Sequence, residues 1–216
     1  MKKLLSASLM CADLGALRDS IYQLEKAGID YLHIDIMDGS FVPNITLGFD
    51  LVNTIKNITD MPLDVHMMVN EPARFIDNMK LTENDILCVH YEADIHLQRT
   101  LDKIKSKGIK TGVALNPQTH LDNIEYLREY MDMLLVMTVS PGFAGQKIFE
   151  GAFRKCEDAR KMLGDSMLIE VDGNISLENG SKLSRCGADM FVLGTSSLFM
   201  KDKTLAKAAE DFRGVL

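Results

Sequence analysis

The chain has 216 residues, a net charge of −7 at pH 7, 46% hydrophobic residues and 25% charged residues. This length suits one barrel-sized domain over residues 1–216. The acidic balance argues against a nucleic-acid surface, and no apolar run approaches the length of a membrane span. The four cysteines form no CxxC pair, as expected of free thiols in a reducing compartment. We therefore expect a cytoplasmic protein that binds neither nucleic acid nor a membrane.

Eight short apolar runs recur along the chain, with amphipathic stretches between them. Their alternation predicts strands and helices of the α/β class. Eight units favour a single (β/α)8 TIM barrel over a doubly wound open sheet, because the first strand lacks a glycine-rich dinucleotide turn. The predicted strands are Leu4–Ser8, Tyr31–Asp35, Leu63–Met67, Ile86–His90, Lys110–Leu115, Met133–Thr138, Leu168–Val171 and Met190–Leu193, and the predicted helices include 14–27, 49–58, 97–107, 124–130, 149–163 and 176–186.

The second predicted strand carries two polar residues, His33 and Asp35, in an otherwise apolar run. A strand has a period of two residues, so both side chains point to the same face. Burying such a pair is costly unless a metal or a substrate uses it. The third strand repeats the pattern with Asp64 and His66, and the seventh is followed by Asp172 at a glycine turn.

Four of these side chains suit a metal site. Two imidazoles and two carboxylates are typical ligands of zinc, iron, manganese or cobalt, with positions left open for a substrate. A single inward histidine is more simply explained as a hydrogen-bonded core residue. Three strands that end in the same way favour one shared site at the C-terminal end of the barrel. The predicted ligands of one divalent metal ion per chain are His33, Asp35, His66 and Asp172.

Loops rich in small residues follow the last three predicted strands. Small residues let backbone N–H groups approach an anion, and the last two loops of a barrel often hold phosphate near a helix N-terminus. Tight turns would explain any one of these loops alone, but the three together predict a phosphate site that needs no Lys or Arg. They contain Gly142, Phe143, Ala144 and Gly145, then Gly173 and Asn174, then Gly194 and Thr195.

Asp35 and Asp172 come from strands far apart around the predicted barrel, where they could face a flat substrate from opposite sides. A metal between them could act as a Lewis acid and stabilise an enediolate. One aspartate would remove a proton beside a carbonyl and the other would return one to the opposite face. Metal ligands rarely double as acid and base because a metal lowers their pKa, and the sequence leaves open how these aspartates would do both. Met37, Met68 and Met137 suit either a water-excluding lining or ordinary core packing.

Seven short motifs occur in order from the first predicted strand to the eighth. They are SASLM at 6–10, HIDIMDG at 33–39, FVPN at 41–44, HMMV at 66–69, VMTVSPGFAGQ at 136–146, VDG at 171–173 and GTS at 194–196. In this order they resemble the ribulose-phosphate 3-epimerase family. The resemblance covers essentially the whole chain, and the set is highly specific although no single motif is.

The resemblance implies a metal-dependent barrel of the ribulose-phosphate-binding type, which epimerises C3 of a phosphorylated ketose. The implied reaction converts D-ribulose 5-phosphate to D-xylulose 5-phosphate, with Asp35 and Asp172 as the acid/base pair. His33, Asp35, His66 and Asp172 match the metal ligands of the family. The implied substrate contacts are Ser8, Met37, His66, Met68, Met137, Gly142, Phe143, Ala144, Gly145, Asp172, Gly173, Asn174, Gly194 and Thr195.

Several residues depart from the usual family pattern. Ala144 and Asn174 stand where glycines are common, and Thr138 and Ser140 replace a common Ser and Asn. These changes resemble the branch that converts D-allulose 6-phosphate to D-fructose 6-phosphate, which is the alternative substrate. Asparagine tolerates left-handed backbone, so the phosphate loop can still form. Ribulose phosphate keeps first place only because it is the commoner substrate of the family.

Two further function classes and several residues stay open. A sugar-phosphate lyase would usually need a strand-end Lys, and a non-catalytic sugar-phosphate sensor would not need both aspartates and both histidines. His90 suits a structural role better than a place near the site. Asp38 either orients a ligand or begins a turn, and Asp64 either supports a ligand or is structural. We expect a homo-oligomer, although the apolar C-terminal stretch also suits packing on the barrel.

Overall fold

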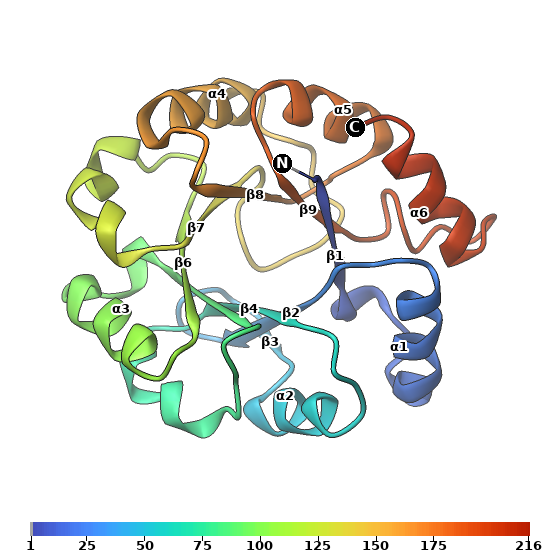
Figure 1. Ribbon diagram of the computed structural model, residues 1–216, viewed down its shortest axis with the longest axis horizontal. Helices are drawn as coiled ribbons and strands as arrows, with labels where there is room; N and C mark the ends of the chain where they lie inside the picture. Colours follow the sequence, from blue (N-terminus) through green and yellow to red (C-terminus); the bar gives the residue numbers. More distant parts are fainter. Residues whose placement is uncertain (1) are drawn as a thin grey trace.

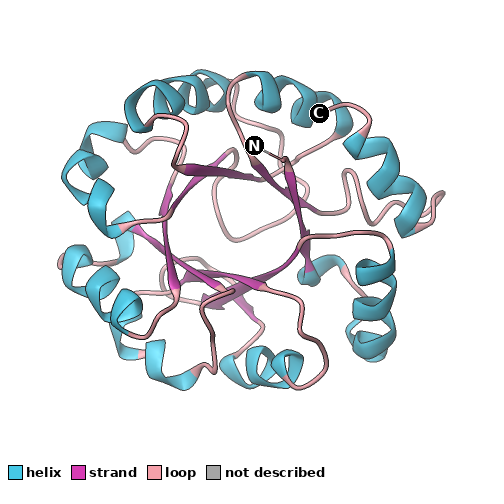
Figure 2. Ribbon diagram, viewed as in Figure 1, coloured by secondary structure: helices cyan, strands magenta, loops and turns pink. Residues whose placement is uncertain are grey.

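The computed structural model describes residues 2–216, which form a closed barrel with helices around it (Figures 1 and 2). Eight parallel strands pair in chain order, and β1 pairs with both β2 and β9, which closes the ring. The predicted TIM barrel is therefore confirmed. The barrel strands are β1 (Leu4–Ser8), β2 (Tyr31–Asp38), β4 (Leu63–Met68), β5 (Ile86–His90), β6 (Lys110–Leu115), β7 (Met133–Met137), β8 (Leu168–Asp172) and β9 (Met190–Leu193).

The helices form the outer layer around the strands (Figure 2), and each buries one set of its side chains. In α3, for example, Leu101 and Ile104 are fully buried while the Lys residues of the helix face outward. None of the helices within residues 2–216 is long and apolar enough to cross a membrane. The α-helices are α1 (Leu17–Lys26), α2 (Phe49–Lys56), α3 (Leu97–Ser106), α4 (Gly151–Leu163), α5 (Leu177–Arg185) and α6 (Leu205–Arg213), and 3₁₀ segments cover Leu9–Cys11, Leu14–Ala16, Pro72–Arg74, Ile76–Asn78, Tyr91–Ala93 and Leu121–Tyr130.

The predicted strands match the observed ones closely, and the largest difference lies in β2. This strand continues three residues beyond Asp35, because its end pairs antiparallel with the short β3 (Ile45–Thr46). The predicted helix over 14–27 begins instead as a 3₁₀ turn, which Asp13 caps by accepting a bond from the Gly15 N–H. The predicted helix over 124–130 is part of the 3₁₀ segment Leu121–Tyr130.

The inner face of the barrel has an apolar side and a polar side. Strands β5, β6, β7 and β9 contribute a buried apolar cluster that includes Cys88, Leu135 and Met190. Strands β1, β2, β4 and β8 instead place buried serine, histidine and carboxylate side chains inside, and His90 at the end of β5 joins them. A polar barrel interior costs free energy unless its groups are paired or used, so the polar side marks where function should be sought.

An aspartate stands directly before every second strand of the ring. Asp30, Asp85, Asp132 and Asp189 precede β2, β5, β7 and β9. Each carboxylate accepts a hydrogen bond from a backbone N–H near the start of the preceding barrel strand. The four donors are Leu5 (2.9 Å), Leu63 (2.8 Å), Thr111 (2.9 Å) and Ile169 (3.2 Å). These bonds tie neighbouring strands together in pairs at the N-terminal end of the barrel.

Candidate metal and substrate site

Four polar side chains meet near the C-terminal end of the barrel: His33 and Asp35 from β2, His66 from β4 and Asp172 from β8. Each offers one ligand atom, and these atoms all lie within 4.8 Å of one another. The register places Asp35 directly beside His66 on the neighbouring strand. The structure thus brings together the four residues that the sequence predicted as ligands, and the cluster could hold a metal ion.

His66 supplies a separate indication of a metal position. Its Nδ1 is buried and has no hydrogen-bond partner among the described residues. This atom faces two carboxylates, at 3.4 Å from Oδ1 of Asp35 and 3.9 Å from Oδ2 of Asp172. A buried polar atom without a partner is costly, and two facing carboxylates call for a positive charge between them. Two imidazole nitrogens and two carboxylate oxygens are a donor set that fits a divalent transition metal.

His33 is held between two carboxylates. Its Nδ1 lies 2.5 Å from Oδ2 of Asp64, and its Nε2 lies 3.2 Å from Oδ1 of Asp35. Asp64 also accepts a hydrogen bond from Oγ of Ser6 at 3.0 Å. Burial lowers the pKa of His33, but the charges of Asp64 and Asp35 outweigh it and raise that pKa well above its ordinary value. Asp64, which the sequence left open, therefore fixes the ring of a candidate ligand.

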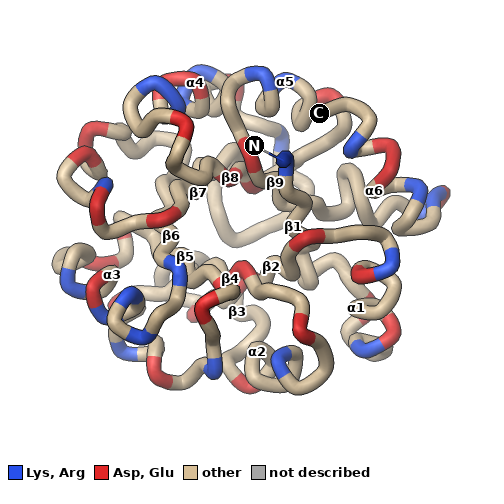
Figure 3. The backbone as a smooth tube through the Cα atoms, in the orientation of Figure 1, with Lys and Arg blue, Asp and Glu red and all other residues tan. Residues whose placement is uncertain are grey.

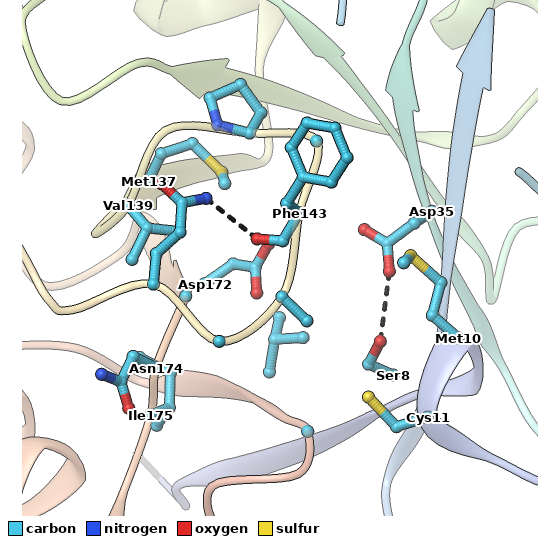
Figure 4. Close-up of a pocket in the computed structure, with 18 of the residues that line it drawn as sticks. Ser8, Met10, Cys11, Asp35, Met137, Val139, Phe143, Asp172, Asn174 and Ile175 are labelled. Atoms are coloured by element: carbon cyan, nitrogen blue, oxygen red, sulfur yellow. Dashed lines mark hydrogen bonds between the residues drawn. The ribbon is translucent and has the colours of Figure 1, made fainter. Parts of the chain in front are cut away.

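Asp35 and Asp172 differ in acidity although both are buried. Burial alone would raise the pKa of Asp35, but the charge and hydrogen bond of His33 bring it well below its ordinary value. Burial raises the pKa of Asp172 to about 6, in part against the charge of His33. Ser8 donates a hydrogen bond to Oδ2 of Asp35 at 3.1 Å (Figure 4). Two carboxylates with separated pKa values can serve as a base and an acid in one site.

A pocket opens beside these two carboxylates, and residues from several strand ends line it (Figure 4). Met37, Met68 and Met137 are buried in its wall, a place that is compatible with both roles left open for them, lining and core packing. All predicted substrate contacts line the pocket except His66, which is fully buried. Further lining residues that were not among the predicted substrate contacts are Met10, Cys11, Val139, Ser140, Pro141, Gln146, Ile175, Val192 and Ser196.

The loops on the far side of the pocket depend on residues that tolerate positive φ. Gly142, Gly145 and Gly173 have φ of +114°, +81° and +113°, and Asn174 has φ of +50°. A Cβ on Gly173 would lie 2.4 Å from Cγ2 of Val139, so this position admits no larger residue without a shift. The replacement of a common glycine by Asn174 is accommodated by left-handed backbone, as expected.

Lys and Arg are confined mainly to the outer helices and loops (Figure 3). Within the described chain, the pocket lining contains neither residue type. An anion bound here would depend on backbone N–H groups and on the N-terminus of α5, which Ser176 caps by accepting a hydrogen bond from the Asn179 N–H. This arrangement fits the phosphate loop predicted from the sequence.

The loop after β2 is fixed by Asp38 and Asn44. Oδ1 of Asp38 accepts hydrogen bonds from the N–H groups of Ser40 and Phe41, both at 2.8 Å, and Oδ2 accepts one from Asn70 at 2.9 Å. Asn44 donates to the carbonyl of Gly142 at 2.9 Å and so joins this loop to the one after β7. Of the two roles left open for Asp38, these bonds favour the turn.

His90 and Glu92 extend the site behind His66. Nε2 of His66 lies 2.8 Å from Nε2 of His90, whose Nδ1 lies 3.1 Å from Oε2 of Glu92. The sequence favoured a structural role for His90 and did not single out Glu92. The signal that could have found them is their spacing of two residues, with His90 at the end of β5 and Glu92 in the 3₁₀ turn after it.

Comparisons with solved structures agree with the barrel. A mutant tryptophan synthase α-subunit from Pyrococcus furiosus superposes with a TM-score of 0.72 at 14% identity, covering 99% of this chain and 100% of that chain. Thiamine phosphate pyrophosphorylase from the same organism gives a TM-score of 0.66 at 13% identity, covering 99% and 94%. At such low identity these structures support the fold alone.

Comparisons with curated sequences are more specific. The chain is 42% identical to a ribulose-phosphate 3-epimerase of Bacillus subtilis, covering 96% of both chains. It is 41% identical to a chloroplastic ribulose-5-phosphate-3-epimerase of Arabidopsis thaliana, covering 92% of this chain and 73% of that one. The sequence model of the ribulose-phosphate 3-epimerase family matches residues 4–199. The chain therefore belongs to the ribulose-phosphate 3-epimerase family.

Proposed function

We propose that this chain is a metal-dependent isomerase that interconverts D-ribulose 5-phosphate and D-xylulose 5-phosphate by epimerisation at C3. The observation that carries the proposal is the pairing of Asp35 and Asp172, two carboxylates of different acidity, at one pocket beside a four-residue ligand cluster. Membership of the family supports the choice of substrate. We further propose that the chain acts as one domain over residues 1–216, in the cytoplasm, as a homo-oligomer that binds neither nucleic acid nor a membrane.

His33, Asp35, His66 and Asp172 would hold one divalent zinc, iron, manganese or cobalt ion. Such an ion, when bound, would supply Lewis-acid stabilisation of the negative charge that develops on the oxygens of the substrate. The ring of His33 is positioned for this by Asp64, and Ser8 holds the second oxygen of Asp35. The chain thus keeps these two ligands in place through neighbouring polar groups.

Proton transfer is assigned to the two aspartates. In the direction that starts with Asp35 ionised and Asp172 protonated, Asp35 takes the C3 proton and the electron pair of that C–H bond moves into the C2 carbonyl, which gives an enediolate. Asp172 then gives its proton to C3 from the opposite face, and the carbonyl re-forms. The configuration at C3 is inverted, and the two aspartates have exchanged protonation states, ready for the reverse direction.

The rest of the pocket would bind and shield the substrate. Backbone N–H groups of the loops at 142–145, 173–174 and 194–195 would hold the phosphate. Met37, Met68 and Met137 present thioethers beside Asp35 and Asp172, where they would exclude water from the enediolate. Excluding water matters here because solvent protons would otherwise compete with the proton that Asp172 delivers.

Proton NMR in D₂O tests this proposal. The metal-loaded protein is incubated with D-ribulose 5-phosphate, and in a parallel tube with D-allulose 6-phosphate. We expect deuterium at C3 of the pentulose together with the xylulose epimer, and loss of both after the metal is removed with a chelator. Absence of exchange at C3 of the pentulose would overturn the proposed substrate, and exchange in the hexulose tube alone would transfer the activity to the six-carbon sugar.

A further inference from the structure

A chain of three buried or half-buried side chains runs from the ligand cluster to the 3₁₀ turn after β5: His66, His90 and Glu92. The rings of His66 and His90 stack with their centroids 5.0 Å apart, and their Nε2 atoms lie 2.8 Å apart. Nδ1 of His90 faces Oε2 of Glu92 at 3.1 Å. Phe41 covers His90 at a centroid distance of 4.7 Å, and His90 is fully buried. Protein groups, not water, therefore decide which nitrogens carry protons.

Glu92 can only accept hydrogen bonds in this setting. Its Oε1 accepts from the Asn116 N–H at 2.9 Å and from the Thr119 hydroxyl. Burial would raise the pKa of Glu92, but the bonds from His90, Thr119 and Asn116 lower it to about 2. An ionised carboxylate has no proton to give, so the proton of the 3.1 Å contact belongs to Nδ1 of His90.

The protonation of the two histidines then follows step by step. His90 is fully buried beneath Phe41, where a charged ring is disfavoured, and its Nδ1 proton is used in the hydrogen bond to Glu92, so its Nε2 is a bare acceptor. The 2.8 Å contact between the two Nε2 atoms needs one proton, which must come from His66. Nδ1 of His66 is thereby left to face Asp35 and Asp172, where it has no hydrogen-bond partner within residues 2–216.

We propose that Glu92, acting through His90, holds the proton of His66 on Nε2 and so reserves Nδ1 of His66 for a metal ion. Glu92 and His90 are positioning residues, since neither lines the pocket. The inference rests on the proposed function insofar as it treats His66 as a metal ligand. In this proposal the imidazole of His90 orients His66, whereas the carboxylate of Asp64 orients His33 directly.

Two substitutions of Glu92 separate this role from simple packing. Glu92→Gln keeps the size of the side chain, but its amide oxygen must stay with the Asn116 N–H, so its NH₂ faces Nδ1 of His90 and donates to it. That reverses the chain: Nε2 of His90 becomes protonated and donates to His66, and Nδ1 of His66 takes the proton. Glu92→Asp is shorter but still only accepts. A packing role predicts the larger defect for Glu92→Asp, and the proposed role predicts it for Glu92→Gln.

The first readout is long-range ¹H–¹⁵N NMR of the histidine rings, which reports directly which nitrogens carry protons. The chain has only five histidines, and the signals of His66 and His90 can be assigned by substitution. In the metal-free native protein we expect a proton on Nδ1 but not Nε2 of His90, and a proton on Nε2 of His66. In Glu92→Gln we expect a proton on Nε2 of His90.

The second readout is metal affinity, measured by competition with a chromophoric chelator for Zn²⁺. We expect Glu92→Gln to weaken binding about 10–100-fold, the usual cost of losing a group that orients a ligand. Glu92→Asp should lose less. A proton on Nε2 of His90 in the native protein would overturn the proposal, as would a larger loss of zinc affinity in Glu92→Asp than in folded Glu92→Gln. Neither readout uses turnover, so a failure of the epimerase assignment would be seen separately in the D₂O experiment.

Discussion

The two ends of the barrel use the same residue type in opposite ways. At the N-terminal end the carboxylate of Asp85 is fully buried and accepts hydrogen bonds from the Leu63 N–H, from the N–H and hydroxyl of Thr82, and from Lys56. At the C-terminal end Asp35 and Asp172 both face Nδ1 of His66, which has no hydrogen-bond partner within residues 2–216. The carboxylate of Asp85 is used up in stabilising the ring, whereas Asp35 and Asp172 line a pocket and face this ring nitrogen. The fold thus separates stability from reactivity along the barrel axis.

The largest expected effect is on catalysis, from Asp172→Asn. The amide keeps the size of the side chain but cannot exchange a proton at neutral pH, so we expect turnover of D-ribulose 5-phosphate to fall by at least about 10²–10⁴-fold. Because burial already disfavours the charged form of Asp172, the free energy of unfolding should not fall. Coupled turnover assays and urea unfolding of the same sample check both parts. Near-normal turnover in a folded variant would remove Asp172 from the acid/base pair.

The same Asp→Asn change at the N-terminal end of the barrel should instead lower the free energy of unfolding and leave turnover nearly unchanged. Asp85→Asn places an NH₂ group against donors and removes the charge that faces Lys56. We expect a loss of about 3–5 kcal/mol in the free energy of unfolding, as for other broken buried ion pairs. Turnover per folded molecule should stay within about twofold of the native value, since Asp85 lies at the far end of the ring. A fall in turnover that exceeds the unfolded fraction would contradict the separation of the two ends.

The sequence predicted the site well where a strand's period of two decides the geometry. His33 and Asp35 share a face by that rule, and β-barrel closure brings the C-terminal ends of β2, β4 and β8 to one place. The glycine-rich loops were predictable because positive φ and close backbone approach leave few residue choices. Fold class and strand positions were predictable because each strand is a short apolar run between clear turns.

Contacts that depend on the ring as a whole could not be predicted. The hydrogen bonds from His66 to His90 and on to Glu92 require the sideways pairing of β4 and β5, which no local pattern reveals. The aspartates before β2, β5, β7 and β9 had a visible signal, an Asp directly before each second strand. Its meaning appears only once the neighbouring strands are in register and their free N–H groups face those carboxylates.

A pair of Gly→Ala substitutions, one at each end of the barrel, makes the same comparison with a smaller expected effect. Gly173→Ala would put a Cβ 2.4 Å from Val139 in a backbone with φ of +113°, so we expect a loss of about 1–3 kcal/mol and a raised KM for the sugar phosphate. Gly28→Ala is the matched control, because Gly28 has φ of +74° but nothing within 4 Å of an added Cβ, and it ends α1 just before β2. It should cost stability without changing KM. Equal KM values in the two variants would show that the loop at Gly173 does not hold the phosphate.

The smallest expected effect is the pH dependence that Asp30 gives to stability. Burial would raise its pKa, but hydrogen bonds from Lys2, Leu5 and Arg213 hold it below the ordinary value. The unfolded chain therefore binds a proton at higher pH than the folded one, and the stabilisation from Asp30 is present above the ordinary pKa and lost as pH falls through the lowered one. Because Asp30 is partly exposed, we expect under about 1 kcal/mol, seen as a gap between native protein and Asp30→Asn that closes on acidification.

The metal-free protein should show the opposite sign at the other end. Asp172 has a folded pKa of about 6, above its unfolded value, so the folded state binds the extra proton between those two values. The native protein should therefore gain stability relative to Asp172→Asn as pH falls through about 6, while it loses stability relative to Asp30→Asn in more acidic solution. Urea unfolding of all three proteins across this range measures both gaps. If the two stability differences changed in the same direction as pH falls, the carboxylates at the two ends would not be held in different electrostatic settings.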